Sequence, residues 1–104
     1  MFEQPPPGVF AGDVPDGALL VDVREADEWA EARVPSSLHL PMSEFVARQH
    51  ELPDQRLYVL CHVGARSARV AAYLQQQGVD AINVQGGLVA WEAAGRPVVY
   101  GSEA

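Results

Sequence analysis

The sequence predicts an α/β domain in which a central, mostly parallel sheet is flanked by helices on both faces. Short apolar runs of strand length, such as residues 57–60 (LYVL), alternate with amphipathic stretches of helix length, such as residues 67–77. The apolar runs are continuous, as is typical of strands that are buried on both faces of a parallel sheet. A sheet of about five strands suits a domain of this size.

The length of 104 residues is enough for one hydrophobic core and too short for two. Residues 1–8 contain three successive prolines, which exclude a helix or a central strand, so we expect an extended N-terminal arm there. A single domain is predicted at residues 9–100, followed by a short C-terminal tail at residues 101–104. We find no internal repeat or linker in this range.

Charge and composition exclude several classes of function. The net charge is −7 and all seven basic residues are arginines, which argues against nucleic acid or an anionic membrane as a partner. No apolar run approaches the ~20 residues needed to span a bilayer, and no secretory signal pattern is present. The single cysteine cannot form an internal disulfide. A reducing compartment suits a working thiol, so we expect the protein to be cytoplasmic.

The first half of the chain is predicted to contain short elements separated by turn residues. In order, they are an edge strand at 9–10, a turn at 13–17, a central strand at 18–23, a helix at 25–32, a break at 34–37 and a strand at 38–40. The helix is expected to pack Trp29 inward, because Trp29 is its one large apolar residue. The break follows from Pro35, which pushes the residue before it out of the helical region.

The second half is predicted to repeat this alternation. In order, we expect a helix at 43–50, a strand at 57–60, a helix from 67 to about 77, a strand at 81–84, a helix at 88–94 and an extended segment at 97–100. Ser43 is a good N-cap for the first of these helices, with Phe45 and Val46 facing the core. Gly78 stands where a helix C-cap is expected.

The candidate catalytic residue is Cys61, the only cysteine, which follows the apolar strand at 57–60 and opens a turn containing Gly64. The N–H groups of a tight loop and of a helix start converge and favour negative charge at their centre. Nearby Arg66 and Arg69 act in the same direction, so we predict a reactive thiolate in an anion cradle. The alternative is that Cys61 is a small buried apolar residue of the core.

The segment CHVGARS at residues 61–67 resembles the active-site loop of rhodanese-family sulfurtransferases. In that family a Cys opens a short loop, a Gly lies three residues on, and an Arg followed by Ser or Thr closes it. Three further segments are similar to family motifs in the same order: LVDVRE with Glu28 and Trp29, then Val34-Pro35 with LHLP, then GGLVAW near the end. The resemblance covers about residues 18–99 and implies the rhodanese fold.

The resemblance implies a double displacement through a Cys61 persulfide. Sulfur would pass from a donor such as thiosulfate to a thiophilic acceptor: cyanide, a thiol or a protein. Arg66 would bind the anionic donor, and the backbone N–H groups of His62, Val63, Gly64, Ala65 and Arg66 would stabilise the Cys61 anion and the persulfide. Ser67 would cap the helix or hydrogen-bond the sulfur. No cofactor is implied, and the scattered histidines lack metal-ligand spacing, so we expect no metal site.

Two other functions remain open from the sequence. A cysteine phosphatase or arsenate reductase of related fold needs the longer loop C-x5-R, whereas this chain has C-x4-R. A rhodanese-like module that binds a protein without catalysis often lacks the cysteine.

His62 is interpreted as a residue of the loop rim, with a general base as the alternative. Asp22 and Arg24 are expected to hold a strand end and a loop together. In place of the family's Gly-His the chain has Ala32-Arg33, which adds positive charge.

Overall fold

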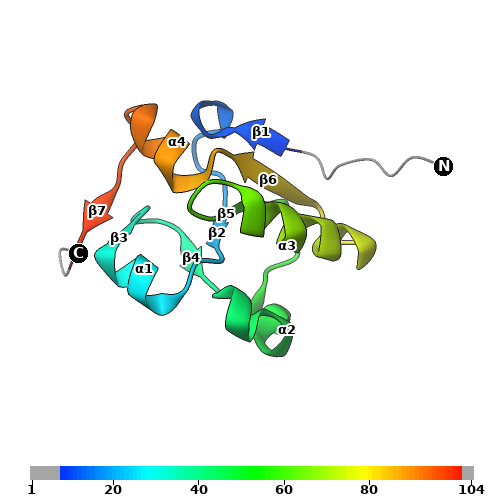
Figure 1. Cartoon of the computed structure of the whole chain (residues 1–104). Coiled ribbons are helices and arrows are strands. Elements are labelled where there is room, and N and C mark those ends of the chain that lie inside the picture. Colours follow the sequence, from blue (N-terminus) through cyan, green and yellow to red (C-terminus); the bar gives the residue numbers. More distant parts are fainter. Residues whose placement is uncertain (1–7, 102–104) are drawn as a thin grey trace.

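The computed structural model describes residues 8–101 and has a five-stranded, entirely parallel sheet at its centre (Figure 1). The strand order is β1-β6-β5-β2-β4. The strands are β1 (Gly8–Phe10), β2 (Leu20–Asp22), β4 (Leu38–His39), β5 (Leu57–Leu60) and β6 (Ala81–Gln85). The predicted α/β architecture is therefore confirmed, and the sheet places the end of β5 at the middle of its carboxyl edge.

The sheet carries a buried apolar layer on each face. Side chains of a strand point alternately to opposite faces, and β5 shows this directly. Val59 belongs to the cluster that includes Leu74 of α3 (Ala65–Gln76), and Leu60 belongs to the cluster that includes Trp91 of α4 (Gly87–Ala93). Phe45 of α2 (Phe45–Arg48) lies on the same face as α3. Helices thus cover both faces, as predicted.

A second, two-stranded sheet was not predicted. After α1 (Ala26–Glu31), the strand β3 (Ala32–Arg33) pairs antiparallel with β7 (Val99–Tyr100). Ala32 was expected at the end of the helix, and the segment 97–100 was expected to be extended, with no pairing assigned to it. The pairing joins two-residue strands that are far apart in the sequence, so neither strand has a local pattern that could reveal it.

The region predicted as one helix at 43–50 is divided. A 3-10 turn at Met42–Glu44, α2 at Phe45–Arg48 and a second 3-10 turn at Gln49–Glu51 follow one another. Ser43 is not an N-cap, because its hydroxyl and its N–H donate to the carboxylate of Glu25. Phe45 is buried as expected, but Val46 is 71% exposed, so the prediction that it faces the core was wrong.

The ends of the chain are only partly described. Gly8, assigned by the sequence to the N-terminal arm, is the first residue of β1. The rest of the predicted arm, residues 1–7, and residues 102–104 of the predicted tail lie outside the described residues. Within residues 8–101, no helix has both the length and the apolar character that crossing a bilayer requires.

Candidate active site

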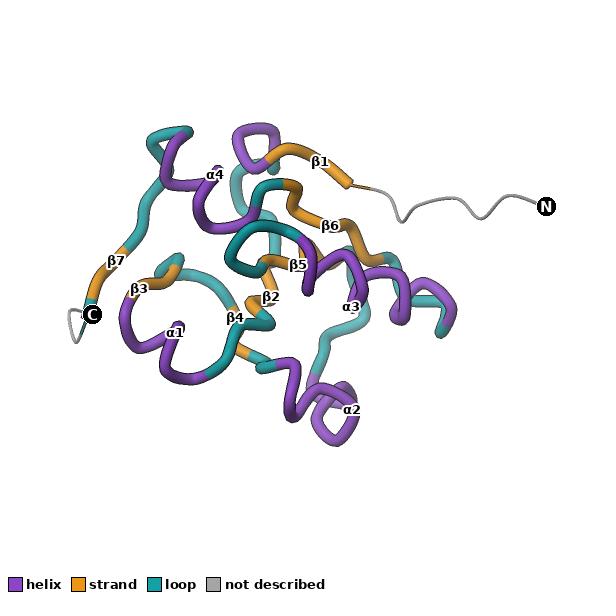
Figure 2. Tube along the Cα trace, in the orientation of Figure 1, coloured by secondary structure: helices purple, strands orange, loops and turns teal. Residues whose placement is uncertain are grey.

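The loop that begins at Cys61 lies at the carboxyl edge of the sheet, between β5 and α3 (Figure 2). Gly64 is the residue before the helix and has φ 108°, a conformation that suits glycine. The helix starts at Ala65, two residues earlier than predicted. Arg66 and Ser67 therefore lie in the first turn of α3, where unpaired N–H groups and the helix dipole favour negative charge.

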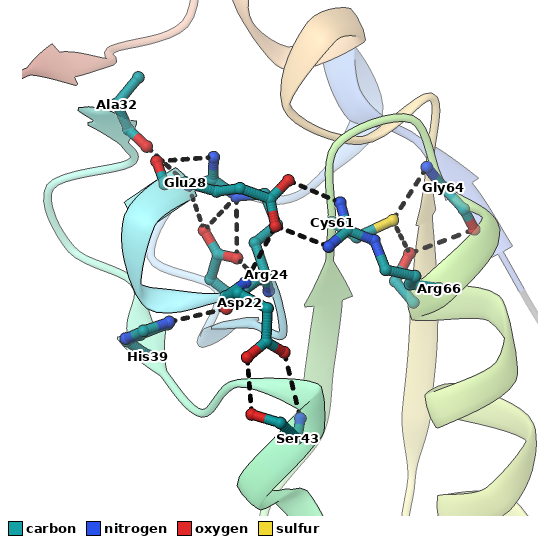
Figure 3. A network of polar contacts seen from close by, with 11 residues as sticks. Asp22, Arg24, Glu28, Ala32, His39, Ser43, Cys61, Gly64 and Arg66 are labelled. Carbon is teal, nitrogen blue, oxygen red and sulfur yellow. Dashed lines mark hydrogen bonds and ion pairs between the residues drawn. The ribbon is translucent and has the colours of Figure 1, made fainter. Parts of the chain in front are cut away.

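The sulfur of Cys61 is a hydrogen-bond acceptor at the start of α3. Its Sγ accepts from the Gly64 N–H at 3.0 Å (Figure 3). It also lies 3.2 Å from the Ser67 hydroxyl. The side chain is only 1% exposed and packs within the cluster on the α3 face. A purely structural buried cysteine does not need such donors. The contacts are those that would stabilise a thiolate.

Asn83 completes this polar group and was not identified from the sequence. Its Oδ1 lies 2.6 Å from the Ser67 hydroxyl. Both side chains are buried, that of Asn83 on β6 and that of Ser67 on α3. The Asn83 amide also approaches the carbonyl oxygen of Gly64, at 3.5 Å. A lone amide in the otherwise apolar strand AINV was the available signal, since buried polar groups are usually hydrogen-bonded.

The start of α4 is fastened to the Cys61 loop. The N–H of Leu88 donates to the Cys61 carbonyl at 2.8 Å, and that of Val89 donates to the His62 carbonyl at 3.1 Å. Gly87 allows this close approach, because a Cβ at its position would lie 2.5 Å from both carbonyl oxygens. The carbonyl groups of Cys61 and His62 are thus bound to α4, so the loop is held by α4 as well as by its own helix.

Arg66 lies beside the loop, but Glu28 of α1 binds its guanidinium. Nη1 is 2.6 Å from Oε1 and Nη2 is 2.8 Å from Oε2, a bidentate ion pair (Figure 3). The hydrogen bonds from Arg66 lower the pKa of Glu28 from 4.5 to about 2. The pKa of Arg66 is raised, mainly by Glu28 and to a smaller extent by the charge of nearby Cys61. The sequence places Glu28 in a motif but does not reveal its role at the site.

Asp22 and Arg24 form a buried pair at the end of β2. Arg24 donates through Nε and Nη2 to the Asp22 carboxylate, at distances of 2.8–3.1 Å, and the side chains of Arg24 and Asp22 are 3% and 0% exposed. The same guanidinium binds the carbonyl oxygens of Glu28 and Ala32. Arg24 therefore ties the strand end to α1 and to the residue that follows it, which confirms the structural role expected for the pair.

The remaining loop residues form the rim of the site. His62, Val63 and Ala65 are exposed, and His62 lines a pocket of about 260 Å³ between α1 and α4. His39 is elsewhere, stacked on Trp29 at 4.5 Å with its Nε2 on the Arg24 carbonyl. Among residues 8–101, no three His, Cys, Asp or Glu side chains are grouped as metal ligands would be.

Comparison with known proteins agrees with this geometry. Residues 10–94 match the model of the rhodanese-like domain, so the chain belongs to that family. It is 41% identical to a protein named sulfurtransferase from Allochromatium vinosum, over 81% of this chain and 80% of the relative. It is 36% identical to the thiosulfate sulfurtransferase GlpE of Pseudomonas savastanoi pv. phaseolicola, over 88% and 89%. A rhodanese-related protein from Thermoplasma volcanium has a similar structure, with a TM-score of 0.84, 31% identity and coverage of 89% and 97%.

Proposed function

We propose that this protein is a sulfurtransferase that moves sulfane sulfur from a donor such as thiosulfate to a thiophilic acceptor through a persulfide on Cys61. The observation that carries the proposal is the Cys61 sulfur, which accepts the Gly64 N–H and adjoins the Ser67 hydroxyl at the start of α3. The names of the relatives support the same reaction class.

In the first step the Cys61 thiolate attacks the outer sulfur of thiosulfate. The new bond joins Sγ to that sulfur, the sulfur–sulfur bond of thiosulfate breaks, and sulfite leaves with the electron pair. Arg66 is proposed to bind the sulfonate oxygens through the N–H groups that it does not share with Glu28, because a guanidinium has five donors.

In the second step the acceptor attacks the outer sulfur of the persulfide. Cyanide would leave as thiocyanate and a thiol as a hydropersulfide, and each restores the Cys61 thiolate. Cys61 is buried, so a direct approach to Sγ needs a small reactant. The added sulfur extends the reach of the residue by about 2 Å, the length of a sulfur–sulfur bond, which helps a larger thiol or a protein acceptor to reach it.

The loop is proposed to stabilise both the Cys61 thiolate and the persulfide anion that forms on it. The N–H groups of residues 62–66 would surround the outer sulfur, in addition to the Gly64 contact with Sγ. Gly64 supplies the left-handed backbone that turns its N–H toward the sulfur. Ser67 hydrogen-bonds the sulfur, and His62 and Val63 form the rim through which reactants enter.

The spacing of the loop supports sulfur transfer over phosphoryl transfer. Arg66 is the fifth residue after Cys61, one fewer than in the wider loops of cysteine phosphatases. The reaction also needs a reduced thiol, so we place the protein in a reducing compartment such as the cytoplasm.

Intact-mass spectrometry after treatment with thiosulfate tests the proposal. The wild type should gain the mass of one sulfur atom and lose it again on addition of cyanide, with release of thiocyanate. Cys61→Ser should gain nothing. A wild-type protein that gains no sulfur, or a Cys61→Ser variant that gains as much as the wild type, would contradict the persulfide mechanism.

A further inference from the structure

The guanidinium expected to bind an anionic donor already carries a carboxylate. Both terminal nitrogens of Arg66 are used in the bidentate pair with Glu28, at 2.6 Å and 2.8 Å. Such a pair has no net charge, although Arg66 keeps further N–H groups for a ligand. An anionic sulfur donor can therefore still accept hydrogen bonds from Arg66, but the positive charge of the guanidinium is largely offset by Glu28.

The side chain of Glu28 is held in position by a hydrogen bond within its own helix, α1. Its Oε1 also accepts the N–H of Glu25 at 3.0 Å, in a capping box at the start of α1. Glu25 is fixed in turn by the N–H and the hydroxyl of Ser43. The hydrogen bonds of Arg66 keep the pKa of Glu28 at about 2, so the carboxylate is ionised at neutral pH. Its charge is a permanent part of the site.

The pocket next to the loop adds more negative charge. Glu31 of α1 and Glu92 of α4 line it together with Glu28 and His62. Arg24 also lines this pocket, but its guanidinium is paired with Asp22. A doubly charged donor would be repelled more strongly here than a singly charged one, because the repulsion grows with the charge of the donor.

We propose that Glu28 is a specificity-determining residue that offsets Arg66 and so favours sulfur donors with at most one negative charge over the dianion thiosulfate. The favoured class contains thiosulfonates and hydropersulfides. With a hydropersulfide, the Cys61 thiolate takes the outer sulfur together with its proton, and a thiolate leaves with the electron pair, so charge and atoms balance. This inference rests on the proposed sulfur transfer at Cys61.

A matched pair of donors tests it. Thiosulfate and methanethiosulfonate both offer an outer sulfur on an oxidised sulfur, but a methyl group replaces one charged oxygen in the second. The quantity to measure is the ratio of kcat/KM for thiosulfate to that for methanethiosulfonate, in the wild type, Glu28→Gln and Glu31→Gln. The change of this ratio between proteins is the readout, because the intrinsic reactivity of each donor then cancels.

Glu28→Gln should raise the ratio about fivefold, the size expected when a charged hydrogen-bonding partner is removed from a pair that is about a third exposed. Glutamine can still accept the Glu25 N–H, so the capping box is kept. Glu31→Gln is the matched control: it removes the same charge from the same helix and the same pocket, and leaves the Arg66–Glu28 pair intact. It should change the ratio by less than about twofold.

The other outcomes distinguish a failure of the proposed role of Glu28 from a failure of the proposed sulfur transfer at Cys61. An equal ratio in the wild type and Glu28→Gln, or a fall in the ratio, would overturn the role of Glu28 while sulfur transfer stands. Failure of the wild type to take sulfur from either donor would overturn both.

A measurement without any variant covers the case in which Glu28→Gln does not fold. Added salt should raise the wild-type ratio, because it screens the extra charge of thiosulfate, and a flat or falling ratio would contradict the proposal.

Discussion

The Oδ1 atom of Asn83 lies 2.6 Å from the hydroxyl oxygen of Ser67, which itself lies 3.2 Å from the sulfur of Cys61. The hydroxyl has a single proton to donate, and the carbonyl oxygen of Gly64 is a further acceptor at 3.2 Å. The contacts link β6 to the Cys61 loop through α3. An ionised sulfur attracts that proton more strongly than a neutral acceptor does, so the hydroxyl can respond to the charge on Cys61.

Removal of this hydroxyl should make Cys61 less reactive. We expect Ser67→Ala to slow the alkylation of Cys61 by iodoacetamide at neutral pH about fivefold, since a hydrogen bond of about 1 kcal/mol to the thiolate is lost. The variant should also lose about 1–2 kcal/mol of unfolding free energy in urea, because the buried Asn83 loses a partner. An unchanged alkylation rate would mean that Ser67 only supports the structure.

Gly87 should be intolerant of a side chain. In Gly87→Ala the new Cβ would meet the carbonyl oxygens of Cys61 and His62 at 2.5 Å, and the residue has φ 59°. We expect a loss of about 2–4 kcal/mol in unfolding free energy and little remaining sulfur transfer.

The control for Gly87→Ala is Gly78→Ala, which lies just after the end of α3 that is far from the Cys61 loop. Gly78 also has a positive φ, of 82°, but a Cβ at its position would point into open space, with nothing to meet within 4 Å. We expect only the backbone strain of about 1–2 kcal/mol and normal activity per folded molecule. Equal loss of activity in the two variants would contradict a specific role of Gly87 at the loop.

Arg66→Ala should weaken the binding of thiosulfate. The variant removes the proposed donor to the sulfonate oxygens and leaves Glu28 without its partner, so both effects should raise KM, by about tenfold or more. Arg69→Ala provides the comparison, because it removes an equal charge from an exposed position of the same helix. Steady-state kinetics with thiosulfate and cyanide would show the difference, and equal KM values for the two variants would exclude Arg66 from donor binding.

The ion pair between Glu28 and Arg66 should make stability depend on acid pH. The pKa of Glu28 is about 2 in the folded protein, lowered from its ordinary value of 4.5 mainly by the hydrogen bonds from Arg66. Its contribution is therefore present above pH 4.5 and is lost as the pH falls toward 2. The side chains are about a third exposed, at 30% and 35%, so we expect about 1 kcal/mol. Urea unfolding of the wild type and Glu28→Gln should differ at pH 7 and converge at low pH, and a constant difference would contradict this assignment.

The features of the fold that depend on local pattern could be predicted from the sequence. The apolar run at β5 and the helical spacing in α3 gave both elements to within about two residues, because buried strands and amphipathic helices have distinct periods. The pairing of β3 with β7 could not be predicted, since it depends on long-range contacts. The division of residues 42–51 was also missed, because Ser43 binds Glu25 of α1 in place of capping its own helix.

The site was predictable as far as its loop. Cys61, Gly64 and Ser67 are close in the sequence and lie together in the structure. Asn83 and Glu28 approach them from other elements, and only the sheet order brings these residues near the loop. Arg66 illustrates the difference: the sequence places it five residues after Cys61, whereas its pairing with the Glu28 carboxylate required the three-dimensional arrangement.

Because β6 and α4 follow Cys61 in the chain, their contacts with its loop have a consequence for synthesis on the ribosome. Cys61 emerges from the exit tunnel before Asn83 and before the N–H groups of Leu88 and Val89 that hold the loop. A nascent chain that stops short of them carries a cysteine without these partners. The full set of contacts around the Cys61 loop can therefore form only after residues 83–89 have been synthesised and have left the tunnel.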